Sequence, residues 1–188
     1  VEERLHRGDL LNPPAVHHDH PLTGLGNDRH VVGDQHDRRV LPLVLELQHQ
    51  LFDELDHVDL YLIHWPCPRQ DRYVESWRAL ISLRDQGLVR SIGVSNFTAE
   101  NLRRLVDETG VVPAVNQVEL HPRLQQDELR QVHADLGVAT EAWSPLAQAQ
   151  LLDDPVLGEI AAVHGVTSAQ VILRWHLQLG NVIIPKSV

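Results

Sequence analysis

From residue 55 onward, short apolar runs alternate with longer segments that have a helical apolar period. Such runs predict buried strands, and apolar residues that recur every three to four positions predict amphipathic helices. Strands that alternate with helices favour a parallel sheet with helices outside it, because parallel neighbours need a long crossover connection. The alternation therefore predicts an α/β fold. The five expected strands are 58–64, 91–97, 114–120, 138–143 and 181–188.

Turn and capping residues support the expected helices between these strands. Gly87 follows the apolar stripe of 73–86 and suits a helix C-terminus. Thr98 is placed to cap the next helix. Thr167 and Gln170 have the spacing of a capping box at the start of the last helix. Local chemistry and apolar period therefore predict the same elements.

Polar residues stand at the same end of successive strands. In a parallel sheet the carboxyl ends of the strands share one edge, and in a (β/α) barrel they converge on one mouth, where active sites lie. His64, for example, ends an apolar column with Leu60 and Leu62. Each residue alone has an ordinary alternative as a core or surface residue, but the repetition favours a site. The residues are His64, Ser95, Asn96, Gln117, Ser144, Lys186 and Ser187.

Residues 1–54 differ from the rest and are treated as a separate, irregular segment, with 55–188 as the folded unit. Seven of the 13 histidines lie there, and proline and glycine interrupt the segment repeatedly. We expect loop or disorder, since no apolar period is sustained. The cluster 17–20 (HHDH) has a metal-binding alternative, but without a second ligand set an accident of composition is favoured, and no metal site is predicted.

The composition limits the location and partners of the chain. The formal net charge of −10 argues against general nucleic-acid binding. No apolar run approaches the roughly 20 residues that a membrane-spanning helix needs, and no secretory signal is visible. The single cysteine, Cys67, excludes an internal disulfide. We therefore expect a cytoplasmic protein that binds neither nucleic acid nor membranes.

Four segments in order resemble the aldo-keto reductase family. They are 59–66 (DLYLIHWP), 87–97 (GLVRSIGVSNF), 116–122 (NQVELHP) and 184–187 (IPKS). The branch similar to bacterial 2,5-diketo-gluconate reductases fits well, because Trp143 stands where many relatives have tyrosine. The resemblance covers residues 55–188 and implies strands four to eight of a (β/α)8 TIM barrel. The expected fold is a partial barrel of about five βα units with an irregular N-terminal segment.

The resemblance also implies NADPH as cofactor and a small-molecule carbonyl substrate. His64 would be the catalytic residue that orients the carbonyl, and Trp65 would contact the substrate with it. The implied cofactor contacts are Ser95, Asn96 and Gln117 at the nicotinamide carboxamide, Trp143 stacked on the ring, Ser144, Leu146 and Gln148 along the pyrophosphate, and Lys186, Ser187 and Val188 at the 2′-phosphate.

The sequence departs from the family in its proton donor. Family members use a tyrosine, tuned by a lysine and an aspartate, from the first three barrel strands, and nothing here matches those strands. The chain has two tyrosines, Tyr61 and Tyr73, and neither is expected at the barrel mouth. We therefore expect a reductase of aldehydes and ketones in truncated form with impaired activity. Two alternatives stay open: a non-catalytic NADPH-binding subunit and a non-functional gene fragment. Open barrel edges would favour self-association.

Overall fold

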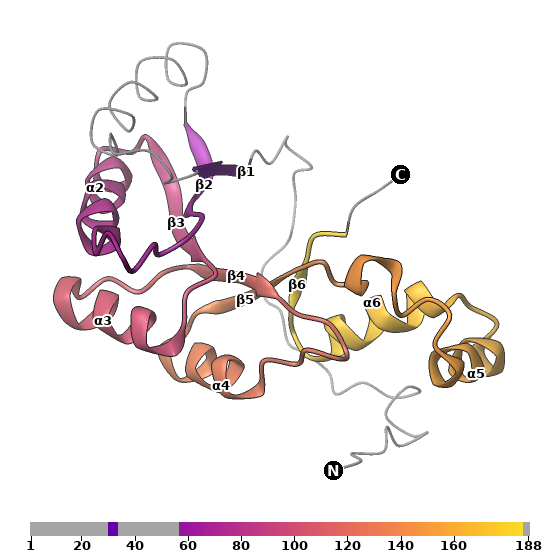
Figure 1. The fold of residues 1–188 in the computed structure, drawn as a ribbon. Helices are drawn as coiled ribbons and strands as arrows, with labels where there is room; N and C mark the ends of the chain where they lie inside the picture. Colours follow the sequence, from indigo (N-terminus) through magenta and orange to yellow (C-terminus); the bar gives the residue numbers. More distant parts are fainter. Residues whose placement is uncertain (1–29, 34–56, 186–188) are drawn as a thin grey trace.

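The computed structural model describes residues 30–33 and 57–185, and within them a parallel sheet orders its six strands as they follow in sequence (Figure 1). Each neighbouring pair is parallel. All carboxyl ends of the strands therefore lie on one edge of the sheet. The strands are β1 His30–Gly33, β2 Val58–Ile63, β3 Val89–Ser95, β4 Val115–Glu119, β5 Ala139–Trp143 and β6 Val182–Ile183.

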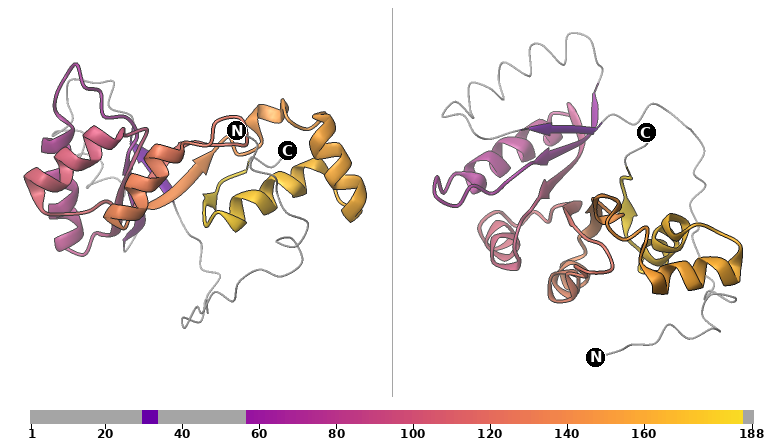
Figure 2. Two further views of the ribbon diagram at one scale, coloured as in Figure 1. Left: turned by 90° about the horizontal axis from the view of Figure 1, so that it is seen from below. Right: turned by 45° about the vertical axis from the view of Figure 1, so that its right-hand side comes forward.

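Helices connect the strands from β2 to β6 and cover the outside of the sheet. Figure 2 shows α2, α3, α4 and α6 following one another along the outer side of the strands. Among the described residues no single helix is long and apolar enough to cross a membrane, although the bent pair α5–α6 passes by length and composition. The helices are α2 Tyr73–Asp85, α3 Ala99–Thr109, α4 Asp127–Leu136, the 3₁₀ turn η1 Ala147–Ala149, α5 Pro155–His164 and α6 Ser168–Gln178.

The expected α/β architecture is confirmed, with three differences in the strands. β3 runs from Val89 to Ser95, two residues earlier at both ends than the expected 91–97. β1 was not expected, because four residues (HVVG) are too few to establish a strand period; the strand is defined by pairing, from His30 opposite Leu60 to Gly33 opposite Ile63. Of the expected strand 181–188 the structure shows β6 at Val182–Ile183, with residues 184–185 outside the strand and 186–188 outside the described residues. The remaining parts of 1–54, the 17–20 cluster included, lie outside the described residues.

The helix-facing side of the sheet forms the main apolar core. Tyr61 and Ile63 of β2 point to this side and pack in one cluster with Trp77 of α2 and Leu102 and Leu105 of α3. Trp77, Leu102 and Leu105 are fully buried. Burying side chains of this size stabilises a fold by about 1.5–3 kcal/mol each. Because side chains alternate along a strand, His64 faces away from this core, toward the concave side.

On the opposite face, the central strands approach one another closely at Gly93 of β3. A Cβ at this position would lie 2.6 Å from Val115 Cγ1, 2.7 Å from Leu62 Cδ2 and 2.9 Å from the Val115 carbonyl oxygen. The carbonyl belongs to the neighbouring strand and cannot move without breaking the ladder. Only glycine therefore allows β2, β3 and β4 to keep this spacing.

A buried polar network joins β4, β5, α4 and the turn after β3. Asn116 donates through Nδ2 to the Phe97 carbonyl (2.9 Å) and to His133 Nε2 (2.9 Å), and its Oδ1 accepts from the Phe97 N–H (3.3 Å). Since Nε2 accepts, His133 carries its hydrogen on Nδ1 and donates it to Thr140 Oγ1 (2.8 Å). Burial lowers the pKa of His133 to about 4, and the charge of Arg130 adds to the effect. The imidazole is therefore neutral in the folded protein.

Replacing Gly93 with alanine should destabilise the fold, because the added methyl meets Leu62 and the β4 backbone. We expect a loss of about 3 kcal/mol in the free energy of unfolding, measured by urea denaturation. The matched control is Gly158→Ala in α5, where a Cβ meets nothing within 4 Å. That change should be neutral or stabilising by about 0.5–1 kcal/mol. Equal midpoints for the two variants would contradict the close approach of the strands.

Acid should weaken the fold through His133. Its folded pKa lies below the ordinary value of about 6.5, so the unfolded chain takes up a proton first as the pH falls. The free energy of unfolding should therefore fall from about pH 6.5 to about pH 4, by up to about 3 kcal/mol, and level off below that range. His133→Gln should reduce this dependence, measured by urea denaturation across pH, and leave the smaller part that comes from His176, whose pKa burial also lowers. His164→Gln, at an exposed histidine of α5, should keep it; a flat wild-type profile would refute the assignment.

Candidate functional site

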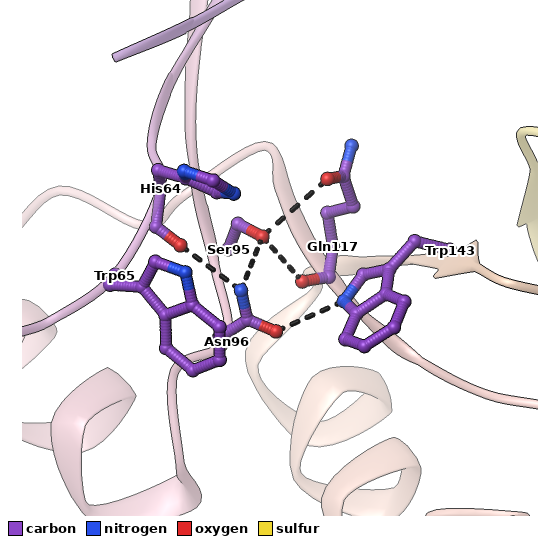
Figure 3. Close-up of a pocket in the computed structure, with 6 residues that line it drawn as sticks. All are labelled: His64, Trp65, Ser95, Asn96, Gln117 and Trp143. Carbon is purple, nitrogen blue, oxygen red and sulfur yellow. Dashed lines mark hydrogen bonds between the residues drawn. The ribbon is translucent and has the colours of Figure 1, made fainter. Parts of the chain in front are cut away.

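A pocket of about 280 Å³ lies at the carboxyl ends of β2 to β5 (Figure 3). β2, β3 and β5 contribute their last residue or the residues directly after it, and β4 contributes Gln117, two residues before its end. The structure thus brings together six of the expected site residues, whose functional roles stay predictions. They are His64 and Trp65 after β2, Ser95 and Asn96 at the end of β3, Gln117 of β4 and Trp143 of β5.

Asn96 holds three of these strand ends together through its side-chain amide. Its Nδ2 donates to the His64 carbonyl and to Ser95 Oγ, both at 3.1 Å. Its Oδ1 accepts from the indole Nε1–H of Trp143 at 3.0 Å. The residue has a φ of 60°, a left-handed conformation that asparagine tolerates better than most residues. The bend turns the chain out of β3 and places the amide between the His64 carbonyl and the Trp143 indole (Figure 3).

Ser95 and Gln117 join β3 to β4 beside this amide. The two residues are register partners in the parallel pair. The Gln117 carbonyl accepts from Ser95 Oγ (2.9 Å) and from the Asn96 backbone N–H (2.9 Å). Ser95 is fully buried and Gln117 is 7% exposed. The side chains are therefore held by the protein before any ligand arrives.

Glu141 is a buried carboxyl beside Gln117 that the sequence analysis did not single out. Gln117 Nε2 donates to Glu141 Oε1 at 3.0 Å, and Glu141 is 1% exposed. The period of two along β5 was a usable signal, because it puts residues 141 and 143 on one face of an apolar strand. A glutamate at such a position needs a hydrogen-bond donor.

Aromatic surfaces form two sides of the pocket. Trp143 is half-buried and fixed by its hydrogen bond, while Trp65 is 43% exposed. The rings of His64 and Trp65 lie 6.1 Å apart, centroid to centroid, at an angle of 51°. The site therefore pairs flat apolar walls with a small set of amide, hydroxyl and imidazole groups, the usual make-up of a small-molecule pocket.

The other expected cofactor residues lie away from this pocket or outside the described part. Ser144 and Leu146 follow β5 in the loop that leads into η1, and Gln148 lies within η1 and is exposed. A hydrogen bond from His176 Nε2 to the Pro145 carbonyl (3.2 Å) ties this loop to α6. Burial lowers the pKa of His176, which keeps the ring neutral. Three further expected residues, Lys186, Ser187 and Val188, lie outside the described residues.

Neither tyrosine of the chain lines the pocket. Tyr61 packs in the helix-facing core, and burial raises the pKa of its phenol. The Tyr73 hydroxyl accepts hydrogen bonds from Arg104 Nη1 (3.2 Å) and Asn101 Nδ2 (3.4 Å) at the start of α2. The described residues also hold no group of three or more His, Cys, Asp or Glu side chains that could bind a metal ion. His64 is therefore the pocket's one titratable lining group among the described residues.

Comparison with known proteins identifies the family. The model of the aldo/keto reductase family matches residues 47–188. The chain is 63% identical over 134 residues to an aldo-keto reductase of Mycolicibacterium smegmatis, covering 71% of this chain and 49% of that protein. It is 58% identical over 134 residues to 2,5-diketo-D-gluconic acid reductase B of a Corynebacterium species, covering 71% and 48%.

A solved structure agrees with these sequence matches. The D53A mutant of Gox0644 in complex with NADPH has a TM-score of 0.73 and 51% identity, with 79% of this chain and 54% of that chain covered. The chain spans about half the length of the curated relatives that it matches. Family model, identity and fold agree, so the chain belongs to the aldo/keto reductase family.

Proposed function

We propose that the pocket is the nicotinamide end of an NADPH site in a reductase of small carbonyl compounds. The observation that carries the proposal is the Asn96 amide, which binds the His64 carbonyl, Ser95 and the Trp143 indole at once. The Asn96 amide holds the Trp143 indole as a flat wall beside amide and hydroxyl groups. Such a pocket suits a ligand whose aromatic ring carries a polar substituent. The NADPH complex of Gox0644 supports this choice of cofactor.

Each lining residue has a role in this proposal. The Trp143 indole stacks on the nicotinamide, and Ser95, Asn96 and Gln117 hydrogen-bond its carboxamide, which fixes the ring face turned to the substrate. His64 orients the substrate carbonyl through a ring nitrogen, and the exposed Trp65 forms an apolar wall beside it. The proposed contacts farther along the cofactor are Ser144, Leu146 and Gln148 at the pyrophosphate and Lys186, Ser187 and Val188 at the 2′-phosphate.

The chemistry sets a limit on this chain acting by itself. Bound NADPH would supply a hydride to the carbonyl carbon, and the oxygen then needs a proton. Neither tyrosine lines the pocket, and both hydroxyls are engaged or buried elsewhere. We therefore propose impaired turnover, with cofactor binding retained. A non-catalytic NADPH-binding subunit is the second candidate, favoured by the same missing phenol.

The substrate class and the setting complete the proposal. The similarity to 2,5-diketo-D-gluconic acid reductase B favours a dicarbonyl sugar acid as a test substrate. A cytoplasmic location stays a prediction.

β1 and β6 are the edge strands of the described sheet, and we propose that the chain self-associates through them. Sedimentation that finds a monomer at every concentration would refute self-association.

Titration with NADPH tests the cofactor assignment. Nicotinamide fluorescence should report saturable binding, and Trp143→Ala should weaken it about tenfold, because the ring loses its stacking wall. Trp175→Phe, in α6 and away from the pocket, is the matched control and should bind as the parent does. Adding a dicarbonyl sugar acid should then give little or no loss of NADPH absorbance.

The outcomes of this titration separate the candidates. Absence of binding would contradict the proposed cofactor site and leave the non-functional alternative. Binding with turnover in the ordinary range of aldehyde reductases would contradict impaired activity, and would require a proton donor other than Tyr61 or Tyr73. Equal affinity of Trp143→Ala and the parent would move the nicotinamide away from this pocket.

A further inference from the structure

The side-chain amide of Gln117 is held by the buried carboxylate of Glu141. Gln117 Nε2 donates to Glu141 Oε1 at 3.0 Å, and the two residues are 7% and 1% exposed. A carboxylate offers acceptors only, so the NH₂ end of the amide must face it. Reversing the amide would place two oxygens in contact in a buried site, which is strongly unfavourable. The contact therefore selects one of the two amide orientations.

The remaining oxygen of Gln117 is consequently turned the other way. Figure 3 shows Oε1 on the side of Ser95, whose Oγ lies 3.5 Å away. Ser95 gives its one hydrogen to the nearer Gln117 carbonyl oxygen at 2.9 Å. Gln117 Oε1 thus lines the pocket with its acceptor capacity largely free.

The hydrogen-bonding capacity that Ser95, Asn96 and Gln117 leave unused is all of one kind. Both Nδ2 hydrogens of Asn96 are used, on the His64 carbonyl and on Ser95 Oγ. Asn96 Oδ1 accepts once, from Trp143, and can accept again. Ser95 Oγ and Gln117 Oε1 also keep acceptor capacity. The three side chains therefore present oxygen acceptors, and their complement is a ligand group that carries N–H donors.

We infer that Glu141 is a positioning residue that fixes the Gln117 amide with its oxygen toward the pocket, and that the site thereby selects a primary carboxamide over a group without N–H. The inference rests on the proposed function, because it concerns the nicotinamide carboxamide. Glu141 acts through Gln117 and touches neither cofactor nor substrate.

Two nucleotides that differ in one group test the inference. The 3-acetylpyridine analogue of NADP⁺ carries an acetyl group where NADP⁺ carries the carboxamide, so it has no N–H to donate. The parent should bind NADP⁺ about tenfold more tightly than the analogue, in competition against NADPH fluorescence, since the analogue leaves a buried acceptor unpaired. In Glu141→Gln the new amide can donate as well as accept, which lets Gln117 reverse. The preference should then fall to about threefold or less.

The control and the second readout separate positioning from structural support. Glu159→Gln makes the same charge change on an exposed residue of α5 and should keep the parent's preference. A purely structural role for Glu141 would weaken both nucleotides equally and leave their ratio unchanged. In the parent without ligand, nuclear magnetic resonance should find the Gln117 NH₂ protected from exchange, with one hydrogen strongly deshielded by the carboxylate.

Each outcome decides a different claim. A parent that binds both nucleotides equally, a ratio that Glu141→Gln leaves unchanged, or an unprotected Gln117 NH₂ would overturn the inference while the cofactor site stands. The resonance measurement needs no variant and decides the matter even where Glu141→Gln fails to fold. A parent that binds neither nucleotide would contradict the proposed function, and the inference with it.

Discussion

The organisation of the pocket depends on one side-chain amide in a left-handed backbone bend. Asn96 takes a φ of 60° directly after β3, which turns its side chain across the carboxyl ends of the neighbouring strands. From there it binds the His64 carbonyl after β2, Ser95 of β3 and the Trp143 indole of β5. The amide and indole hydrogens of this network are all donated within the protein, which holds its members in fixed orientations and leaves acceptor capacity for a ligand. A ligand meets a preorganised site.

That arrangement requires strands that are parallel, in register and close together. Gly93 permits the close approach of β2, β3 and β4 on the concave side. On the helix-facing side, Asn116 binds both backbone groups of Phe97, the residue that follows Asn96, and neutral His133 accepts a hydrogen bond from the same Asn116 amide. The bend that presents the Asn96 amide is thus supported by the core. The residues that stabilise the strands therefore also support the geometry of the site.

Most of the strands and helices, and part of the site, were predictable from the sequence because their residues recur with a regular period. Apolar runs and caps predicted the strands and helices from 58 to 183, and polar residues after successive runs predicted that His64, Asn96 and Gln117 would meet. Trp143 was expected beside them only through the family resemblance. β1 was not predictable, because a four-residue strand is defined by its partner rather than by its own pattern. Glu141 was missed although the period of two along β5 puts it on the same face as Trp143, because its role comes from a contact with Gln117 of the neighbouring strand β4.

The central claim is that a nicotinamide binds against Trp143 at the convergence of these strand ends. The four tryptophans give four indole N–H resonances, two from the pocket (Trp65 and Trp143) and two from elsewhere (Trp77 in the core and Trp175 on α6). Adding NADPH to indole-¹⁵N-labelled protein should shift the signals of Trp143 and Trp65 and leave the other two in place. Unchanged pocket signals, or shifts confined to Trp77 and Trp175, would contradict the account.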